Sequence, residues 1–313
     1  MVGVTSPPRA RLIRVIHAEL ERIANHLDVV MRLCDAAGLA VPLARFGWHK
    51  ECILRLISAL CGNRFGRSLV CAGGVTAEPQ LAPTAISEQV AAILHRVRGD
   101  RDALMIDASF LDRLRGTGYL DASLAASHGA LGPVGRGSGC DDDARLRAYD
   151  GYAELPVVAG AAVDHDGDAL ARLRVRWAEI DMAANLIQRS CDGLATMADK
   201  ALTVETPTVD GFALGWAEAP QGEVLYALEV RGGVIGRCFA RSAPSIACWC
   251  FTTYSEGTSS PTFRSSKPVS ACATPGWRCR CHGYSEGCAM GFSQPAGPRA
   301  QTSTTTTSQQ RCR

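Results

Sequence analysis

Residues 11–30, RLIRVIHAELERIANHLDVV, decide the fold of the first part of this chain. Their apolar side chains recur at three- and four-residue steps: Leu12, Ile16, Leu20, Ile23, Leu27 and Val30. Because an α-helix turns once in about 3.6 residues, this spacing puts those side chains on one face. The stretch therefore predicts a long helix that packs against other elements along one side.

Three further stretches, at residues 53–60, 86–97 and 170–197, show the same helical spacing. The Gly62-Asn63 pair predicts the end of the first, since glycine readily adopts the left-handed conformation that closes a helix. Asp166 or Asp168 is the predicted cap at the start of the last, because a carboxylate there can accept a bond from a free N–H group. Together these stretches predict a helical bundle.

After Val204 the pattern changes. The stretch GEVLYALEVRGGVIGRCFARS alternates around Gly232-Gly233, which predicts a β-hairpin. The glycine-rich stretch GALGPVGRGSGCDDDAR, residues 129–145, predicts a turn or loop. We therefore expect a mainly α fold, a helical bundle with a small C-terminal β-hairpin region.

The last 64 residues, 250–313, differ in kind from the rest. They hold no Leu or Ile, and Ser, Thr, Gly and Pro dominate them. Ordering a backbone costs about 1–2 kcal/mol per residue, and so little apolar surface cannot offset that cost. We expect residues 1–249 to be the globular domain and residues 250–313 to be a disordered tail.

The net charge of +2 includes no basic stripe, which argues against a nucleic-acid partner. The N-terminal residues carry too many charges for a signal peptide, and no uncharged apolar run reaches the ~20 residues that span a bilayer. Fourteen cysteines are present. Several lie within helical patterns, where a buried thiol acts as a small apolar group, so we expect a reducing cytoplasmic compartment.

Charged residues gather in three places. Glu19, Arg22 and His26 share one face of the first predicted helix and can pair with one another. A hydrogen-bonded packing role for His26 is the more common alternative to proton transfer.

Arg136, Asp143 and Arg145 flank a glycine loop within the glycine-rich stretch, either as a buried network or as part of an interface. Glu218 and Glu223 bracket a predicted turn, so both carboxylates could face one partner. No strand precedes GRGSG and no GK[ST] follows it, which excludes a phosphate loop. Asp141 to Asp143 read as a loop cap and not as a metal site.

Four motifs occur in order. They are ELERIANHL (19–27), LGPVGRGSGCDDDAR (131–145), GDALARLRVRWAEI (167–180), and EAPQGE (218–223) with RSAPSIACW (241–249). At these spacings the chain resembles the large subunit of membrane-bound nickel–iron hydrogenases of the formate-hydrogenlyase and hydrogenase-4 type, and the homologous D-type subunit of NADH:quinone oxidoreductase.

The resemblance implies partners: a small iron–sulfur subunit and membrane subunits, which would hold this chain on the cytoplasmic face of the inner membrane. In the family, a nickel–iron centre, or quinone and NADH, serve the complex. The residues that the resemblance carries over, at the subunit interface and near the metal or quinone pocket, are Arg136, Asp143, Arg145, Glu218 and Glu223.

The nickel–iron centre of the hydrogenases needs two CxxC pairs, and the sequence contains no CxxC. We therefore expect no cofactor, metal or catalytic residue in this copy. Reading straddling codons from Phe251 permits HHIFRGNVFTDFPIIEASF, which resembles the family's ending. A frameshift after Trp249 is our hypothesis for the tail.

Two alternatives stay open. Cys272, Cys279, Cys281, His282 and Cys288 could bind zinc, although their spacing matches no standard zinc site. The expected function is a non-catalytic, large-subunit-like component of a membrane-associated electron-transfer complex. The alternative is a scaffold or assembly module that binds an iron–sulfur subunit without redox chemistry.

Overall fold

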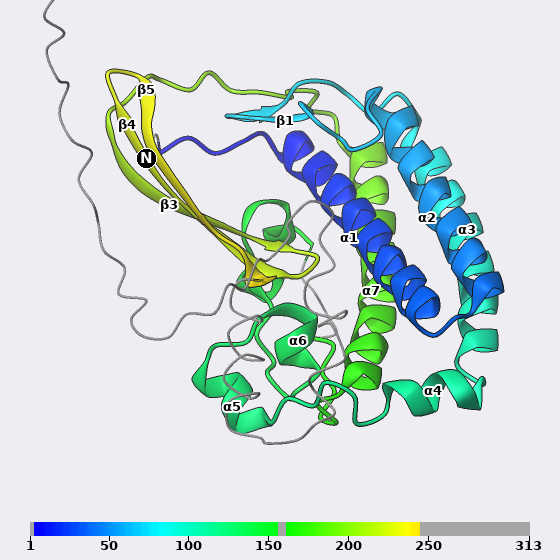
Figure 1. Cartoon of the computed structure of the whole chain (residues 1–313). Helices are drawn as coiled ribbons and strands as arrows, with labels where there is room; N and C mark the ends of the chain where they lie inside the picture. Colours follow the sequence, from blue (N-terminus) through cyan, green and yellow to red (C-terminus); the bar gives the residue numbers. More distant parts are fainter. Residues whose placement is uncertain (1–2, 156–160, 245–313) are drawn as a thin grey trace, which may run out of the picture. The chain divides into compact units, whose positions relative to one another are not determined.

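Four long helices form the bundle that the apolar spacing predicts. They are α1 (Pro8–Ala36), α2 (Ala40–Cys61), α3 (Pro83–Leu104) and α7 (Ala169–Thr196). In this computed structural model, helix α1 packs between α2 and α7, and α3 packs against α2 and α7 (Figure 1). One continuous cluster of buried apolar side chains fills the space between them. The prediction of a helical bundle is confirmed.

The structure describes residues 3–155 and 161–244, all of which belong to one compact unit. The predicted disordered tail at residues 250–313, its zinc alternative and the domain boundary at residue 249 lie outside the described residues. Along the described part, no helix combines the length and the apolarity that crossing a bilayer requires.

The predicted helix ends are found where the capping chemistry puts them. Helix α2 stops at Cys61, and Gly62 follows in the left-handed conformation with φ 72°. Of the two aspartates that could cap α7, Asp168 does so, accepting a 2.8 Å bond from the Ala171 N–H group. Asp166 instead pairs on the surface with Arg174.

The predicted hairpin forms and has a third strand. Strands β4 (Gly222–Arg231) and β5 (Val234–Arg241) turn at Gly232-Gly233, both at positive φ, as a tight hairpin turn requires. Strand β3 (Gly211–Ala219) adds to the other side of β4, so the sheet order is β3-β4-β5 with all pairs antiparallel. The sheet is larger than the hairpin that the sequence predicted.

The glycine-rich stretch is more ordered than the predicted loop. It holds a short helix, α6 (Gly132–Arg136), which begins with Pro133 in its first turn, and it leads into the 3-10 helix η1 (Ala144–Arg147). Asp143 caps η1, as predicted for the aspartate run. The remaining short elements are β1 (Val70–Cys71), β2 (Gly74–Val75), α4 (Ala108–Leu114), α5 (Ala122–Ser127) and η2 (Asp150–Ala153).

Candidate functional site

Charged side chains from four parts of the chain meet in the protein interior. These parts are α1, α6 with the segment that follows it, α7, and the end of β3. Each of these side chains is at most 5% exposed. We call this group the ionic cluster, and its members are Glu19, Arg22, His26, Arg136, Asp143, Arg145, Arg176, Glu179 and Glu218.

Arg136 joins the bundle to the sheet. Its Nε donates to Oε1 of Glu179 on α7 at 3.0 Å, and its Nη1 donates to Oε1 of Glu218 on β3 at 3.1 Å. The same Nη1 also donates to the Asp142 carbonyl at 2.9 Å. Because a guanidinium presents several donors in one plane, a single side chain fixes three segments at once.

Arg145 makes a second junction, toward α1. It grips Asp143 with two donors, Nε to Oδ1 at 3.0 Å and Nη2 to Oδ2 at 2.7 Å. Its Nη1 reaches Oε2 of Glu19 at 3.2 Å. Glu19 also accepts from Arg22 Nε at 3.0 Å and from the Tyr152 hydroxyl. The predicted Glu19–Arg22 pair is therefore present, as part of a larger network.

The predicted pairing of His26 with Glu19 or Arg22 does not occur, although all three residues lie on α1. Its Nε2 lies 2.8 Å from Oε2 of Glu179, and Arg176 approaches its Nδ1 at 3.1 Å. An arginine can only donate, so Nδ1 accepts and Nε2 carries the hydrogen. Burial lowers the pKa of His26 to about 4 despite the Glu179 bond, so the ring is neutral near pH 7. A hydrogen-bonded packing histidine matches this geometry.

The ionic cluster is charge-balanced with His26 neutral. Its four guanidinium groups, of Arg22, Arg136, Arg145 and Arg176, face four carboxylates. Burial raises the pKa of a carboxyl group, but Arg136 and the His26 bond hold the pKa of Glu179 well below its usual value. Burial prevails at Glu218, whose pKa is raised. Glu218 is thus the carboxylate of the cluster that takes up a proton most readily.

The backbone of the β3–β4 turn packs against α1 and α6. Arg22 donates from Nη1 to the Ala219 carbonyl at 3.1 Å and from Nη2 to the Glu218 carbonyl at 2.8 Å. Gly132, at φ +61°, lies so close that a Cβ atom there would be 2.1 Å from the Gln221 carbonyl oxygen. Glycine is required at this contact because any side chain would push the turn away.

Glu218 and Glu223 are direct cross-strand partners, which places them on the same face of the hairpin. They nevertheless bind different arginines. Glu218 is buried against Arg136, whereas the half-buried Glu223 accepts from Arg147 and from Arg241, each at 2.8 Å. The structure does not direct the two carboxylates at one shared partner.

Sequence reasoning missed Glu179 and Arg176, although both lie within a quoted motif. The signal was present: Arg172, Arg176 and Glu179 recur at four- and three-residue steps on the same side of α7 as buried apolar residues. Charges at core positions of an amphipathic helix indicate buried partners. The candidate partners were the charged residues already noted on the first helix and within the glycine-rich stretch.

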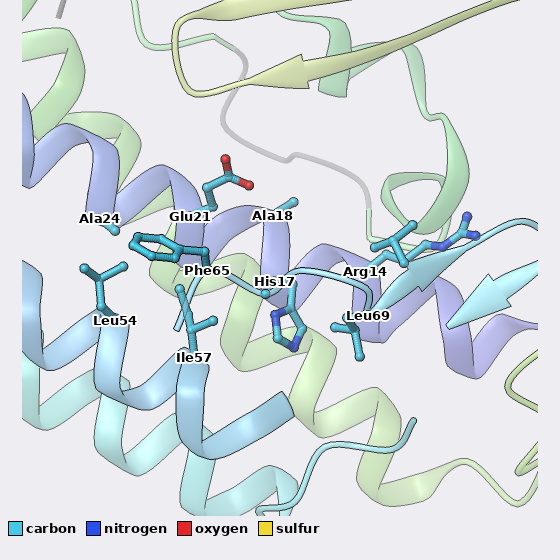
Figure 2. Close-up of a pocket in the computed structure, with 11 residues that line it drawn as sticks. Arg14, His17, Ala18, Glu21, Ala24, Leu54, Ile57, Phe65 and Leu69 are labelled. Carbon is cyan, nitrogen blue, oxygen red and sulfur yellow. The ribbon is translucent and has the colours of Figure 1, made fainter. Parts of the chain in front are cut away.

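A separate cavity of about 260 Å³ lies between α1, α2 and the loop after α2. Figure 2 shows its wall of Leu54, Ile57, Phe65 and Leu69, with the His17 ring between Ile57 and Leu69. Burial lowers the pKa of His17 to about 4, so this ring is also neutral near pH 7. Arg14 and Glu21 also line the cavity, and none of the predicted site residues does.

A nickel–iron centre does not fit the residues that are described. Within residues 3–155 and 161–244, no three His, Cys, Asp or Glu side chains are placed to hold a metal ion. The carboxylates of the ionic cluster are already bound to arginines. Soft-metal centres of this kind need paired thiolates, and the 313-residue sequence contains no CxxC.

The comparison with known proteins gives the kinship. The sequence model of the respiratory-chain NADH dehydrogenase 49 Kd subunit matches residues 38–211. The chain is also similar to the carbon monoxide-induced hydrogenase of Rhodospirillum rubrum, with 30% identity over 74% of this chain and 64% of the relative. With the D 1 subunit of the NADH-quinone oxidoreductase of Streptomyces coelicolor, the identity is 30% over 74% of this chain and 62% of the relative.

A third relative is formate hydrogenlyase subunit 5 of Escherichia coli, 30% identical over 72% of this chain and 39% of that protein. The chain therefore spans less than two thirds of the length of these relatives. The family match itself extends over more than half of the 313 residues, and both kinds of protein that the motifs resemble are found among the relatives. The chain belongs to the family of the 49 kDa subunit of respiratory-chain NADH dehydrogenase, to which subunits of membrane-bound hydrogenases are related.

Proposed function

We propose that this chain is a non-catalytic, large-subunit-like component of a membrane-associated electron-transfer complex. The family match over residues 38–211 supports the assignment to such a complex, and the lack of a CxxC motif in the 313 residues supports the non-catalytic part of the proposal. We further propose that a small iron–sulfur subunit and membrane subunits hold it at the cytoplasmic face of the membrane. Quinone, NADH or hydrogen would then be handled by the complex, and neither nickel nor a dinucleotide would be bound by these 313 residues.

The six candidate residues divide into two roles. His26, Arg136, Asp143, Arg145 and Glu218 are buried and fully engaged within the ionic cluster, which supports a structural role. Glu223 is half-buried and lies beside the exposed Arg147 and Asp142. Of the six, Glu223 is the one that a partner protein could contact directly. An interface role therefore attaches to this surface, with the buried cluster holding it in shape.

Co-expression with the small iron–sulfur subunit that accompanies a relative of the 49 kDa type tests the proposal. We expect the two to purify together and to show neither hydrogen evolution nor NADH-linked quinone reduction. A chain that never binds this iron–sulfur protein would contradict the assignment to the complex. Stoichiometric nickel with hydrogen turnover would contradict the non-catalytic assignment.

The alternative is a scaffold or assembly module that binds the iron–sulfur subunit without redox chemistry of its own. The neutral, balanced ionic cluster favours neither role over the other. Gel filtration of membranes solubilised in mild detergent separates them, because a resident component migrates with the mature complex and an assembly module is absent from it.

A further inference from the structure

Strand β5 is the most exposed strand of the sheet. It pairs with β4 on one side, and within the described residues no strand pairs with its other edge (Figure 1). Every residue from Val234 to Ala240 is exposed, with Ile235 and Phe239 each at 62%. The free edge therefore offers unpaired backbone N–H and C=O groups beside bare side chains.

Apolar side chains lie on both faces of this edge, one of which also carries Arg237 and Arg241. Phe239 pairs across to Ala227, which pairs with Leu214, so these three share one face; Leu214 is 60% exposed. Cys238 shares the other face with its cross-strand partner Leu228. An exposed edge strand with apolar side chains on both faces is a template for pairing with another strand.

The charged residues of β5 indicate which charge a partner strand should carry. The strand holds Arg237 and Arg241 and no carboxylate. Arg241 is bound by Glu223 at 2.8 Å. Arg237 has only a 3.7 Å contact with Glu229, a carboxylate that Arg231 contacts more closely, and the Arg237 side chain is 73% exposed. One cation on this edge is thus available to a carboxylate from outside.

We propose that the free edge of β5 binds an extended strand of another protein, apolar on both faces and with a carboxylate facing Arg237. A second copy of this chain fits less well, because antiparallel pairing of β5 with itself would bring arginines together without any acidic side chain. The proposal does not rest on the redox assignment, so it can fail while the family function stands.

The test uses the full chain and two capped strand peptides of about eight residues, built from valine and threonine. One peptide has a central glutamate and the other a central lysine. The exposed Cys238 thiol reports binding, because a strand paired with β5 slows its alkylation by iodoacetamide. We expect the glutamate peptide to reach half-protection at a concentration about fivefold to tenfold lower, as cross-strand charge pairs allow.

The Arg237→Glu variant supplies the matched reversal and should prefer the lysine peptide by a similar factor. Arg237 is exposed, so its replacement should leave the fold intact, which circular dichroism checks. Equal protection by both peptides, or by neither, would overturn the proposal. Two results without any peptide would also overturn it. Protection of Cys238 that increases with protein concentration would mean that two copies of the chain pair through β5. Protection that disappears when residues 250–313 are removed would mean that the chain covers its own edge.

Discussion

Nε2 of His26 lies 2.8 Å from Oε2 of Glu179, with both side chains completely buried. This contact links the first long helix to the last one, 153 positions away in sequence. Glu179 also receives Arg136, so one carboxylate holds together α1, α7 and the segment that reaches the sheet. The ionic cluster is organised around this glutamate.

Replacing Glu179 by glutamine should destabilise the protein by about 3–5 kcal/mol, because Arg136 would keep its charge in the interior without its main counter-ion. Urea unfolding followed by circular dichroism measures the change. The control on the same helix is Asp181→Asn, which loses only surface pairs with Arg98 and Arg101 and should cost less than about 1 kcal/mol. Equal effects of the two variants would contradict a buried role for Glu179.

The Glu218→Gln variant should be milder, at about 1–2 kcal/mol. Burial already raises the pKa of Glu218, so a neutral side chain is better tolerated there than at Glu179. Arg136 donates to one carboxylate oxygen of Glu218 and the Ala144 N–H group to the other, so the glutamine oxygen can keep the Arg136 bond while the bond from Ala144 is lost. Urea unfolding under the same conditions compares the two variants. A larger loss of unfolding free energy for Glu218→Gln than for Glu179→Gln would contradict this prediction.

Stability should fall as the pH falls from about 6.5 to about 4, partly because of His26. Its pKa in the folded state is about 4, below the ordinary value of 6.5, so the unfolded chain binds more protons in this window. Between about pH 7 and about pH 5 the His26 contribution to this loss is about 2 kcal/mol.

The His26→Gln variant isolates that contribution, since glutamine can also donate to Glu179 and accept from Arg176. Its unfolding free energy should depend less on pH than that of the unmodified protein. His17, whose pKa is also about 4, contributes separately and remains in the variant. An unchanged pH dependence would show that His26 is not buried as a neutral ring.

The contact between Gly132 and the β3–β4 turn gives a steric prediction. Gly132→Ala should prevent the turn from packing against α6, because a Cβ atom would lie 2.1 Å from the Gln221 carbonyl oxygen. Gly116→Ala is the matched control: its φ of +65° is close to the +61° of Gly132, but nothing lies within 4 Å of its added Cβ. Thermal unfolding should show a clearly larger decrease in the midpoint temperature for Gly132→Ala than for Gly116→Ala. Equal decreases would mean that the positive φ alone causes the effect.

The cap of α7 can be tested through the two aspartates that the sequence left open. Asp168→Ala should cost about 1–2 kcal/mol, because the side chain accepts bonds from the N–H groups of Ala171 and Gly116. Asp166→Ala removes only a surface pair with Arg174 and should cost less than about 1 kcal/mol. Chemical denaturation of both variants compares them, and the reverse order would contradict the observed cap.

Much of the bundle could be predicted because periodicity and capping are local properties. The apolar steps from Leu12 to Val30, the Gly62 end and the hairpin turn at Gly232-Gly233 all depend on neighbours in sequence. Strand β3 was missed because its residues alternate between glycine or alanine and large apolar side chains, and both faces are largely exposed, so no clear inside–outside pattern marks it.

The pairing inside the ionic cluster could not be predicted for a different reason. Five of the six candidate residues do fall in it, but their partners are set by tertiary packing. Sequence spacing paired His26 with Glu19 and Arg22, whereas the fold turns it toward Glu179 on α7. Likewise, the spacing of Glu218 and Glu223 around the turn could not show that Glu218 is buried in the interior while Glu223 is half-buried near the surface.

A double-mutant cycle between Arg136 and Glu179 tests most directly whether the family's charged motifs here form one buried structural network. The unfolding free energies of Arg136→Met, Glu179→Gln and the double variant would be measured at neutral pH. The network predicts a coupling of about 2 kcal/mol or more, since the second change removes a charge that the first left unpaired. Additivity within about 0.5 kcal/mol would contradict it.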